Sequence, residues 1–127
     1  MPIRDLEKER AVFAYTKVEE ALAQQIKGSE YKAYCKKIPS LIQTNGLSAT
    51  FAFMFSKRTG TYIFIYNQVD EWLKERYEND NSINNDEELI ERLIKLESAK
   101  YRKVTIEVLA LFSWLRRFAE GRISRDG

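Results

Sequence analysis

The sequence predicts an all-α protein, a compact single-domain bundle of five to six helices around a long C-terminal helix. The first observation is the stretch over residues 98–119, which lacks Gly and Pro and repeats apolar residues at three- and four-residue steps. This is the spacing of one helical face. The second is a similar repeat over residues 3–27. The third is a length of 127 residues with 44% hydrophobic residues, enough for one domain, residues 1–127, with a buried core.

The helix expected over residues 98–119 is the centre of the predicted fold. Its main apolar face comprises Tyr101, Val104, Val108, Leu111, Leu115 and Phe118. Further apolar residues widen this face, which is typical of a helix covered by other helices or by a partner. We expect Gly121 to end the helix and the tail, residues 121–127, to be disordered.

Two more helices are expected near the N-terminus. The first covers residues 3–27, and Gly28 is predicted to end it. The second covers residues 30–37, with Ser29 as its N-terminal cap. The first carries apolar residues on one face, and the second is a basic helix.

A break in the second helix is predicted at Pro39. Because proline disfavours the helical conformation of the residue before it, Ile38 is expected to mark a break or a kink. A short turn of helix then extends to Thr44. Asn45 and Gly46 follow and are predicted to end it, since both tolerate a left-handed backbone.

The stretch over residues 47–66 is compatible with a β-hairpin or with two helices. Phe51, Phe53 and Phe55 alternate before a turn-like SKRTG sequence, which favours a hairpin. The second arm has a helical repeat longer than most strands, which favours two helices. The repeat comprises Tyr62, Ile65, Tyr66, Val69, Trp72, Leu73 and Tyr77.

The remaining chain is a polar connection followed by a further helix. Residues 79–85 read NDNSINN, and Asn85 or Asp86 is predicted to cap the helix that follows. Leu89, Leu93 and Leu96 form its apolar edge. A joint near residues 97–98 then leads into the C-terminal helix.

Charge is segregated along the sequence although the formal net charge is only +2. Residues 27–58 carry six basic groups and one acid, residues 70–91 carry two basic groups and nine acids, and residues 92–127 carry nine basic groups and four acids. Such segregation can create a basic face that neutralises phosphates without reading sequence. The candidate RNA-binding residues are Lys32, Lys36, Lys37, Lys57, Arg58, Lys95, Arg102, Lys103, Arg116 and Arg117.

The residue types argue against catalysis. The sequence has no histidine and one cysteine, which removes His-based acid–base chemistry and a structural zinc site. For Cys35, a packed or merely exposed thiol is favoured over a nucleophile. The acids of residues 70–91 fit no Mg²⁺ loop, and the glycines are too dispersed for a phosphate-binding loop. No catalytic residue, metal or cofactor is therefore predicted.

The same features point to a protein of the cytoplasm. No apolar run approaches the roughly 18 to 20 residues of a membrane helix, and the charged N-terminus does not resemble a signal peptide. One cysteine suits a reducing compartment. No membrane partner is expected.

Two stretches resemble a known family. They are KKIPSLIQTNGLSATFAF, residues 36–53, and YRKVTIEVLALFSWLRRFAE, residues 101–120. Both are similar to the small helical subunit of the type III-B CRISPR effector, the fifth protein of the Cmr module. The first carries a Lys-rich segment, Pro39 and an Asn-Gly-Leu turn that begins at Asn45. The second carries a Tyr-Arg pair and, from Trp114, a Trp-Leu-x-Arg-Phe motif.

The resemblance implies an all-helical fold, which favours helices over residues 47–66, and a non-catalytic role in antiviral defence. Such subunits line a filament of backbone subunits beside a guide–target RNA duplex. The implied partners are the other Cmr complex subunits, the guide RNA and the target RNA. The alternative is a stand-alone helical protein-interaction module without nucleic-acid binding. An enzyme that uses the acidic cluster is the least favoured hypothesis.

Overall fold

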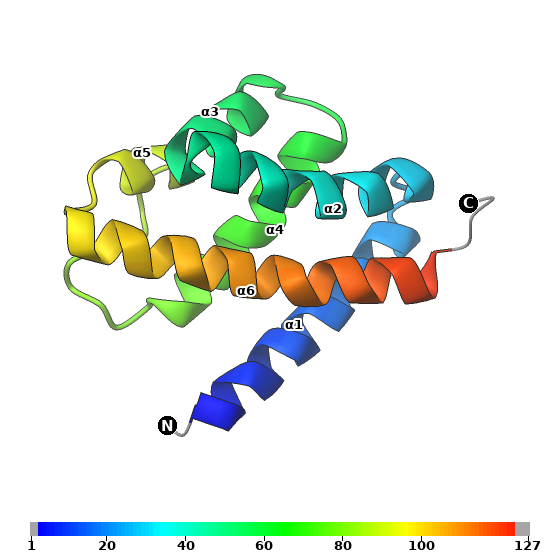
Figure 1. Cartoon of the computed structure of the whole chain (residues 1–127), viewed down its shortest axis with the longest axis horizontal. Coiled ribbons are helices and arrows are strands. Elements are labelled where there is room, and N and C mark those ends of the chain that lie inside the picture. Colours follow the sequence, from blue (N-terminus) through cyan, green and yellow to red (C-terminus); the bar gives the residue numbers. More distant parts are fainter. Residues whose placement is uncertain (1–2, 124–127) are drawn as a thin grey trace. The chain divides into compact units, whose positions relative to one another are not determined.

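The computed structural model of the chain describes the backbone of residues 3–123 and the side chains from residue 5 (Figure 1). Over these residues the protein is built from six α-helices and contains no strand. The helices are α1 (Ile3–Ala23), α2 (Gly28–Asn45), α3 (Leu47–Ser56), α4 (Thr61–Arg76), α5 (Leu89–Ile94) and α6 (Ser98–Arg122). The prediction of an all-α fold with a long C-terminal helix is confirmed.

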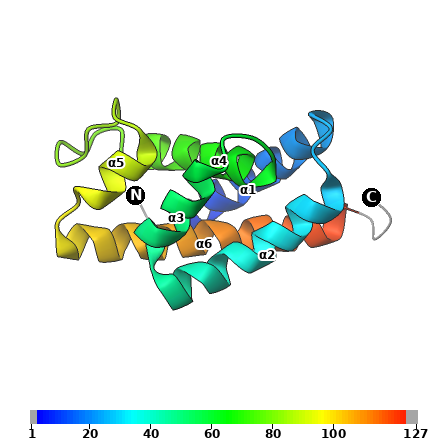
Figure 2. The same ribbon diagram turned by 90° about the horizontal axis from the view of Figure 1, so that it is seen from above.

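The helices form two compact units. The first unit extends to Ser40 and resumes at Glu107, so it contains α1, most of α2 and the second part of α6. The second unit is Leu41–Ile106, which contains the end of α2, α3, α4, α5 and the beginning of α6. Within the second unit α3 packs against both α4 and α5 (Figure 2). That residues 1–127 form one domain stays a prediction.

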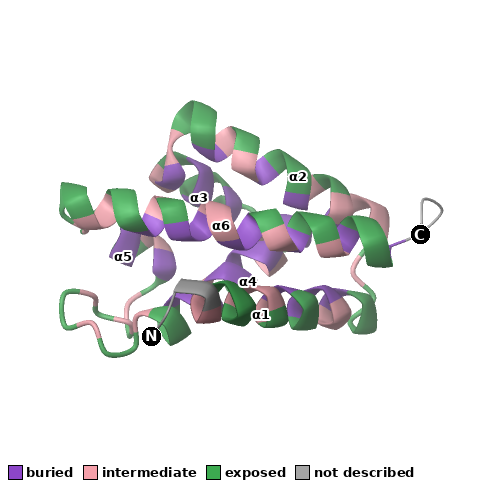
Figure 3. Cartoon of the chain, turned by 60° about the horizontal axis from the view of Figure 1, so that its bottom comes forward, coloured by how far each residue is buried: buried purple, intermediate pink, exposed green. Residues whose placement is uncertain are grey.

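The core of the first unit comes from one face of each of its helices. Buried and exposed residues alternate at helical spacing along α1 and α6 (Figure 3). This pattern is the one expected of amphipathic helices that cover a core. The buried apolar residues of this unit are Ala14, Val18, Ala21, Tyr31, Cys35, Ile38, Val108, Leu111, Phe112, Leu115, Ala119 and Ile123.

Helix α1 ends earlier than predicted, and Gly28 does not end it. The last residue of α1 is Ala23, and Gln25 has a left-handed backbone with φ of 60°. The amide of Gln25 donates to the carbonyl of Leu22 and the amide of Ile26 donates to that of Ala21, which is the Schellman pattern of a helix C-terminus. Glutamine therefore takes the position that the sequence analysis assigned to glycine.

Helix α2 is continuous through Pro39, so the break predicted at Ile38 is wrong, whereas the alternative of a kink there stays a prediction. Proline inside a helix costs about 3 kcal/mol. Cys35, Ile38 and Ile42 are all buried and continue one apolar face on both sides of the proline. Burying each large apolar side chain contributes about 1.5–3 kcal/mol, so burial on the two sides outweighs the cost of the proline.

Residues 47–66 form two helices, α3 and α4, as the helical repeat and the family resemblance predicted. Tyr62, Ile65 and Tyr66 are buried on α4, and Phe51 is buried on α3. The hairpin alternative is excluded because the whole stretch is helical apart from the short connection between Ser56 and Thr61. Of the alternating phenylalanines that favoured a strand, Phe51 and Phe55 both contact Tyr66, whereas Phe53 lies on another side of α3 and contacts Tyr62.

Gly46 separates α2 from α3. Its φ of 91° and ψ of 161° belong to a region that residues with a Cβ rarely adopt. A Cβ at this position would meet the hydroxyl of Tyr101 at 3.8 Å, an ordinary contact. A side chain at position 46 would therefore destabilise the protein through backbone strain and not through a steric clash.

Gly46→Ala is expected to lower the free energy of unfolding by about 1–3 kcal/mol because alanine is strained at this φ. Urea denaturation followed by circular dichroism measures the change. Gly121→Ala, at a helical glycine whose added Cβ would meet nothing within 4 Å, is the matched control and is expected to be neutral or stabilising. Equal effects of the two variants would contradict the explanation.

Tyrosines from other helices cap α3 and α5. Neither helix has a side-chain cap of its own. The amide of Ser48 at the start of α3 donates to the hydroxyl of Tyr101, 2.9 Å away. At the start of α5, the amide of Ile90 donates to the hydroxyl of Tyr66 at 2.9 Å, and that hydroxyl donates to Glu88 at 2.8 Å. Both satisfy amides that a helix start leaves without partners.

The cap predicted for α5 at Asn85 or Asp86 is wrong. The helix begins at Leu89, and Glu88 precedes it. Asn85 instead donates from its side-chain amide to the carbonyl of Tyr77 at 3.0 Å, which ties the polar connection to the end of α4. The sequence showed a suitable capping residue, but its side chain is used to hold the connection.

Helix α6 begins at Ser98, as predicted, and continues to Arg122. The prediction that Gly121 ends it is therefore wrong. The amide of Ile123 donates to the carbonyl of Ala119 at 3.0 Å, and the Ile123 side chain is buried, so this end of the helix is held by packing. Two residues of the tail predicted to be disordered lie within α6, and residues 124–127 lie outside the described residues.

Candidate nucleic-acid interface

The ten predicted RNA-binding residues divide equally between the two units. Those of the first unit are Lys32, Lys36, Lys37, Arg116 and Arg117. Those of the second unit are Lys57, Arg58, Lys95, Arg102 and Lys103. Each unit therefore presents its own candidate surface.

Helix α2 provides the lysines of the first unit. Lys36 and Lys37 are exposed, whereas Tyr31 and Cys35 on the same helix are buried. Lys32 lies one helical turn before Lys36, and its ammonium is 3.5 Å from the carbonyl oxygen of Ile123. This bond places the Lys32 ammonium at the C-terminal end of α6, where the helix dipole stabilises a positive charge.

Arg116 and Arg117 are exposed on α6. The guanidinium of Arg117 lies 5.9 Å from the centre of the Trp114 ring. That ring stacks on Phe118 at 5.6 Å, and Phe118 meets the edge of Tyr15 at 5.3 Å. Trp114 and Phe118 are half-buried, so they contribute to packing inside the first unit.

Lys57 and Arg58 are exposed in the connection between α3 and α4. The Lys57 ammonium lies 4.7 Å from the centre of the Phe53 ring. Arg58 has a left-handed backbone with φ of 61°, which points to a tightly folded connection. Arg102 and Lys103 are exposed on α6 in the same unit.

Lys95 is the predicted cation with the strongest acidic partner. Its ammonium pairs with Glu87 and lies 3.5 Å from Glu91. The hydrogen bond that Lys95 donates to Glu87 raises the pKa of Lys95, so the charge is retained but is already neutralised locally. A phosphate at this position would have to displace a carboxylate.

Six of the ten cations make no side-chain hydrogen bond, ion pair or ring contact with the described residues. They are Lys36, Lys37, Arg58, Arg102, Lys103 and Arg116. Their charges are therefore available to an external anion, whereas those of Lys32, Lys57, Lys95 and Arg117 have neighbours within the protein.

Part of the acidic segment, residues 70–91, forms ion pairs within the second unit. Arg92 is buried, and its guanidinium lies 2.8 Å from Asp70. Asp80 pairs with Lys100 and accepts a hydrogen bond from the amide of Ser82 at 2.9 Å. Over the described residues, no three His, Cys, Asp or Glu side chains are grouped as a metal site.

Asp80 gives the second unit a stability that depends on pH. The hydrogen bond from Lys100 and those from Ser82 lower the pKa of Asp80 from 3.8 to about 2. Because the pKa is depressed in the folded state, the stabilisation is present above pH 3.8 and is lost as pH falls through about 2.

Asp80→Asn is expected to lower the free energy of unfolding by about 1 kcal/mol near pH 6, allowing for solvent screening of this partly exposed pair. Denaturant titrations of both proteins across the acidic range measure the difference. It should shrink as pH falls from 4 and disappear near the folded pKa of about 2. A difference that is constant with pH would contradict the assignment.

Cys35 is a core residue. Its side chain is fully buried, and burial raises the pKa of the thiol to about 12 despite a hydrogen bond with Tyr31. A thiol with this pKa is protonated at neutral pH and is a poor nucleophile.

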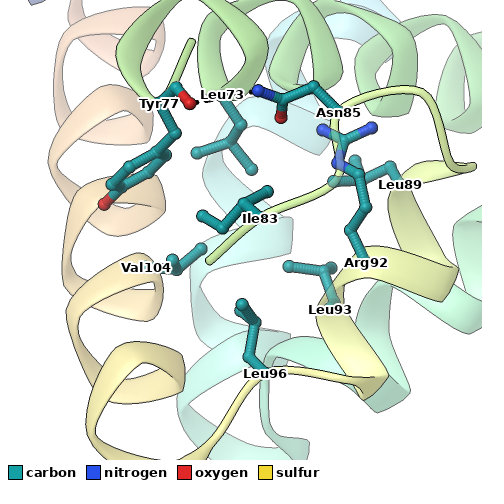
Figure 4. Close-up of a pocket in the computed structure, with 9 residues that line it drawn as sticks. All are labelled: Leu73, Tyr77, Ile83, Asn85, Leu89, Arg92, Leu93, Leu96 and Val104. Carbon is teal, nitrogen blue, oxygen red and sulfur yellow. Dashed lines mark hydrogen bonds between the residues drawn. The ribbon is translucent and has the colours of Figure 1, made fainter. Parts of the chain in front are cut away.

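A small cavity in the second unit is lined mainly by apolar side chains (Figure 4). The lining residues are Leu73, Tyr77, Ile83, Asn85, Leu89, Arg92, Leu93, Leu96 and Val104. About 10 Å³ is open to a water-sized molecule. Ligand pockets usually measure about 300–1,000 Å³, so this cavity is too small for a nucleotide or a cofactor.

Glu107 is the main residue whose role the sequence analysis did not identify. It is an acid in the middle of the most apolar helix, and it is 4% exposed. Arg10 on α1 donates to both of its carboxylate oxygens, from Nε at 2.7 Å and from Nη2 at 2.9 Å. In the sequence, Glu107 is an isolated acid in an apolar helix. This position could have indicated a buried ion pair, because a buried acid requires a cationic partner.

None of the helices, over the part of the chain that the structure describes, combines the length and apolarity needed to cross a membrane.

Comparison with known proteins gives consistent results in sequence and structure. Residues 6–122 match the family of CRISPR-associated proteins Cas_Cmr5. A curated relative, the CRISPR system Cmr subunit Cmr5 of Thermus thermophilus, is 33% identical over 110 residues, which cover 87% of this chain and 89% of the relative. The crystal structure of a CRISPR-associated Cmr5 family protein from the same organism superposes with a TM-score of 0.75 at 31% identity, covering 98% of this chain and 100% of the other. The chain therefore belongs to the Cmr5 family of CRISPR-associated proteins.

Proposed function

We propose that this chain is a non-catalytic small subunit of a type III-B Cmr effector complex in the cytoplasm. In this role it lines the backbone filament and supports the guide–target RNA duplex through its basic side chains. Its partners are the other Cmr subunits, and its contacts with the guide and target RNA are to phosphates. The name of the T. thermophilus relative, a Cmr subunit, supports the assembly part of the proposal.

The observation that carries the RNA part is the set of six exposed cations without partners in the described structure. Lys36 and Lys37 are adjacent on α2, and Arg102 and Lys103 are adjacent on α6. These exposed charges gain no ion pair within the described structure, so they raise the local positive potential of the surface. A polyanion bound there is neutralised by them and releases its own counterions.

The test measures binding of the full chain to a fluorescent RNA duplex over a range of salt concentrations. Replacing Lys36, Lys37, Arg102 and Lys103 together with alanine is expected to weaken binding at low salt by at least about tenfold. The slope of log K against log salt should fall by about 3 to 4, roughly 0.9 per lost phosphate contact.

The matched control replaces two exposed lysines outside the predicted set, Lys8 and Lys74. This variant should retain most of the affinity and nearly all of the salt slope. Wild-type protein without salt-dependent binding would contradict the RNA part of the proposal and favour the stand-alone protein-interaction module. Because the control removes two charges and the test variant four, a control loss of salt slope about half as large as that of the test variant would show that the contribution is net charge alone.

A further inference from the structure

Helix α3 presents an uncharged outer surface with two exposed aromatic rings. We define the α3 face as Ala49, Ala52, Phe53, Phe55 and Ser56, all of which are exposed. The rings of Phe53 and Phe55 are each 42% exposed. The ten residues of α3 include no charged residue, although charged residues make up 31% of the sequence. A surface helix normally places charged residues on its solvent-facing side. The uncharged α3 face is therefore better suited to contact with a partner than to contact with water.

The two rings are held in place by tyrosines of α4. Phe53 meets Tyr62 edge-on, with ring centres 5.1 Å apart, and Phe55 meets Tyr66 at 5.6 Å with tilted rings. Both tyrosines are buried. Rings that are fixed before binding lose little conformational freedom when a partner covers them, which is a property of interface anchor residues.

Positive charge borders the α3 face at one end. Lys57 and Arg58 follow α3 directly and are exposed. They are the only charged residues between positions 38 and 69, so no acid of that segment opposes them. Arg58 makes no side-chain hydrogen bond, ion pair or ring contact with the described residues. A partner that covers the rings therefore gains most by placing a carboxylate against these two cations.

The arrangement fits a protein better than a nucleic-acid strand. Phe53 and Phe55 are two residues apart, which places them about 200° apart around the helix axis. They lie on opposite sides of Ala52 and cannot stack successive bases of one strand, as a single-strand platform requires. The Lys57 ammonium already lies over the Phe53 ring. An apolar helix or strand that spans Ala52 can contact both rings together.

We propose that the α3 face is a docking surface for another protein subunit of the same complex. The segment that docks carries apolar side chains for Phe53 and Phe55 and an acidic side chain for Lys57 and Arg58. This inference rests on the proposed membership of a Cmr complex but not on RNA binding.

The test uses the remaining Cmr subunits and guide RNA, assembled without this chain, and measures uptake of fluorescent full-length chain. Ala52→Arg places a long charged side chain between the two rings at an exposed position, so folding should be unaffected. It is expected to reduce uptake by about tenfold or more. Arg58→Glu should reduce uptake several-fold, and the loss should diminish at high salt. Ala33→Arg, an exposed alanine on α2, is the matched control and should leave uptake unchanged.

Three outcomes would overturn the inference. One is normal uptake of the Ala52→Arg variant. Another is an equal loss of affinity of this variant for the isolated RNA duplex, which would assign the face to RNA. The third is self-association of the isolated wild-type chain in sedimentation that the Ala52→Arg variant loses, which would assign the α3 face to a second copy of the chain. Absence of salt-dependent RNA binding by the wild-type chain, with Ala52→Arg still defective in uptake, would contradict the proposed RNA contacts and leave this inference standing.

Discussion

Replacing Glu107 with alanine is expected to destabilise the first unit by about 3 kcal/mol, the lower end of the range for breaking a buried ion pair. The substitution removes the acid that accepts two hydrogen bonds of the Arg10 guanidinium, whose side chain is 13% exposed. Glu7, which is more exposed, remains as an ion-pair partner of Arg10, so part of the desolvation cost of the guanidinium stays compensated. Equilibrium denaturation in guanidinium measures the loss, and near-complete unfolding at room temperature would be consistent with it.

The control for this prediction replaces both partners, as Arg10→Met with Glu107→Leu. Because no charge is then left buried, much of the lost stability should return. If Glu107→Ala cost less than about 1 kcal/mol, the pair would be behaving as an exposed salt bridge. That result would contradict the assigned burial.

Phe51→Ala is expected to lower the free energy of unfolding by about 3–5 kcal/mol, the usual range for removing a large core ring. Phe51 is 0% exposed in the second unit, and its ring centre lies 5.9 Å from that of Tyr66. The measurement is urea denaturation followed by helical circular dichroism and by tryptophan fluorescence.

Phe53→Ala is the matched control because it makes the same substitution two residues further along α3. Phe53 is 42% exposed, so only part of its area is buried and the expected cost is about 1 kcal/mol. Equal costs at the two positions would contradict the helical orientation of α3. In a strand the two side chains would share one face.

Periodicity predicted most of the helices because long apolar repeats are a local property of the sequence. Val104, Val108 and Leu111 on α6 and Ile65 and Val69 on α4 are all buried, as their spacing predicts. The stretch over residues 47–66 was harder because three alternating phenylalanines also fit a strand. The length of the helical repeat that begins at Tyr62 and the resemblance to a family favoured the helices that the structure contains.

Helix boundaries were less predictable because tertiary contacts determine them. Pro39 interrupts a helix by its local chemistry, but burial on both sides keeps α2 continuous. The amides at the start of α3 and α5 are satisfied by Tyr101 and Tyr66, which are distant in sequence. No local pattern reveals a cap that comes from another helix.

The candidate interface shows a similar division. The basic residue types and their grouping along the chain follow from the sequence alone. Which cations are already neutralised depends on the fold: Lys95 pairs with Glu87, whereas Lys36 and Lys37 remain exposed without partners among the described residues. The α3 face was not predicted because the sequence left open whether its phenylalanines belong to a strand or to a helix, and the exposed side chains follow only from the fold.

The most direct test of the central claim is purification of the tagged chain from its native host at moderate salt, with identification of the bound proteins and sequencing of the bound RNA. The proposed function predicts recovery of the other Cmr subunits together with short guide RNAs. Recovery of the chain alone, without RNA even at low salt, would contradict it and leave a helical module that binds protein partners.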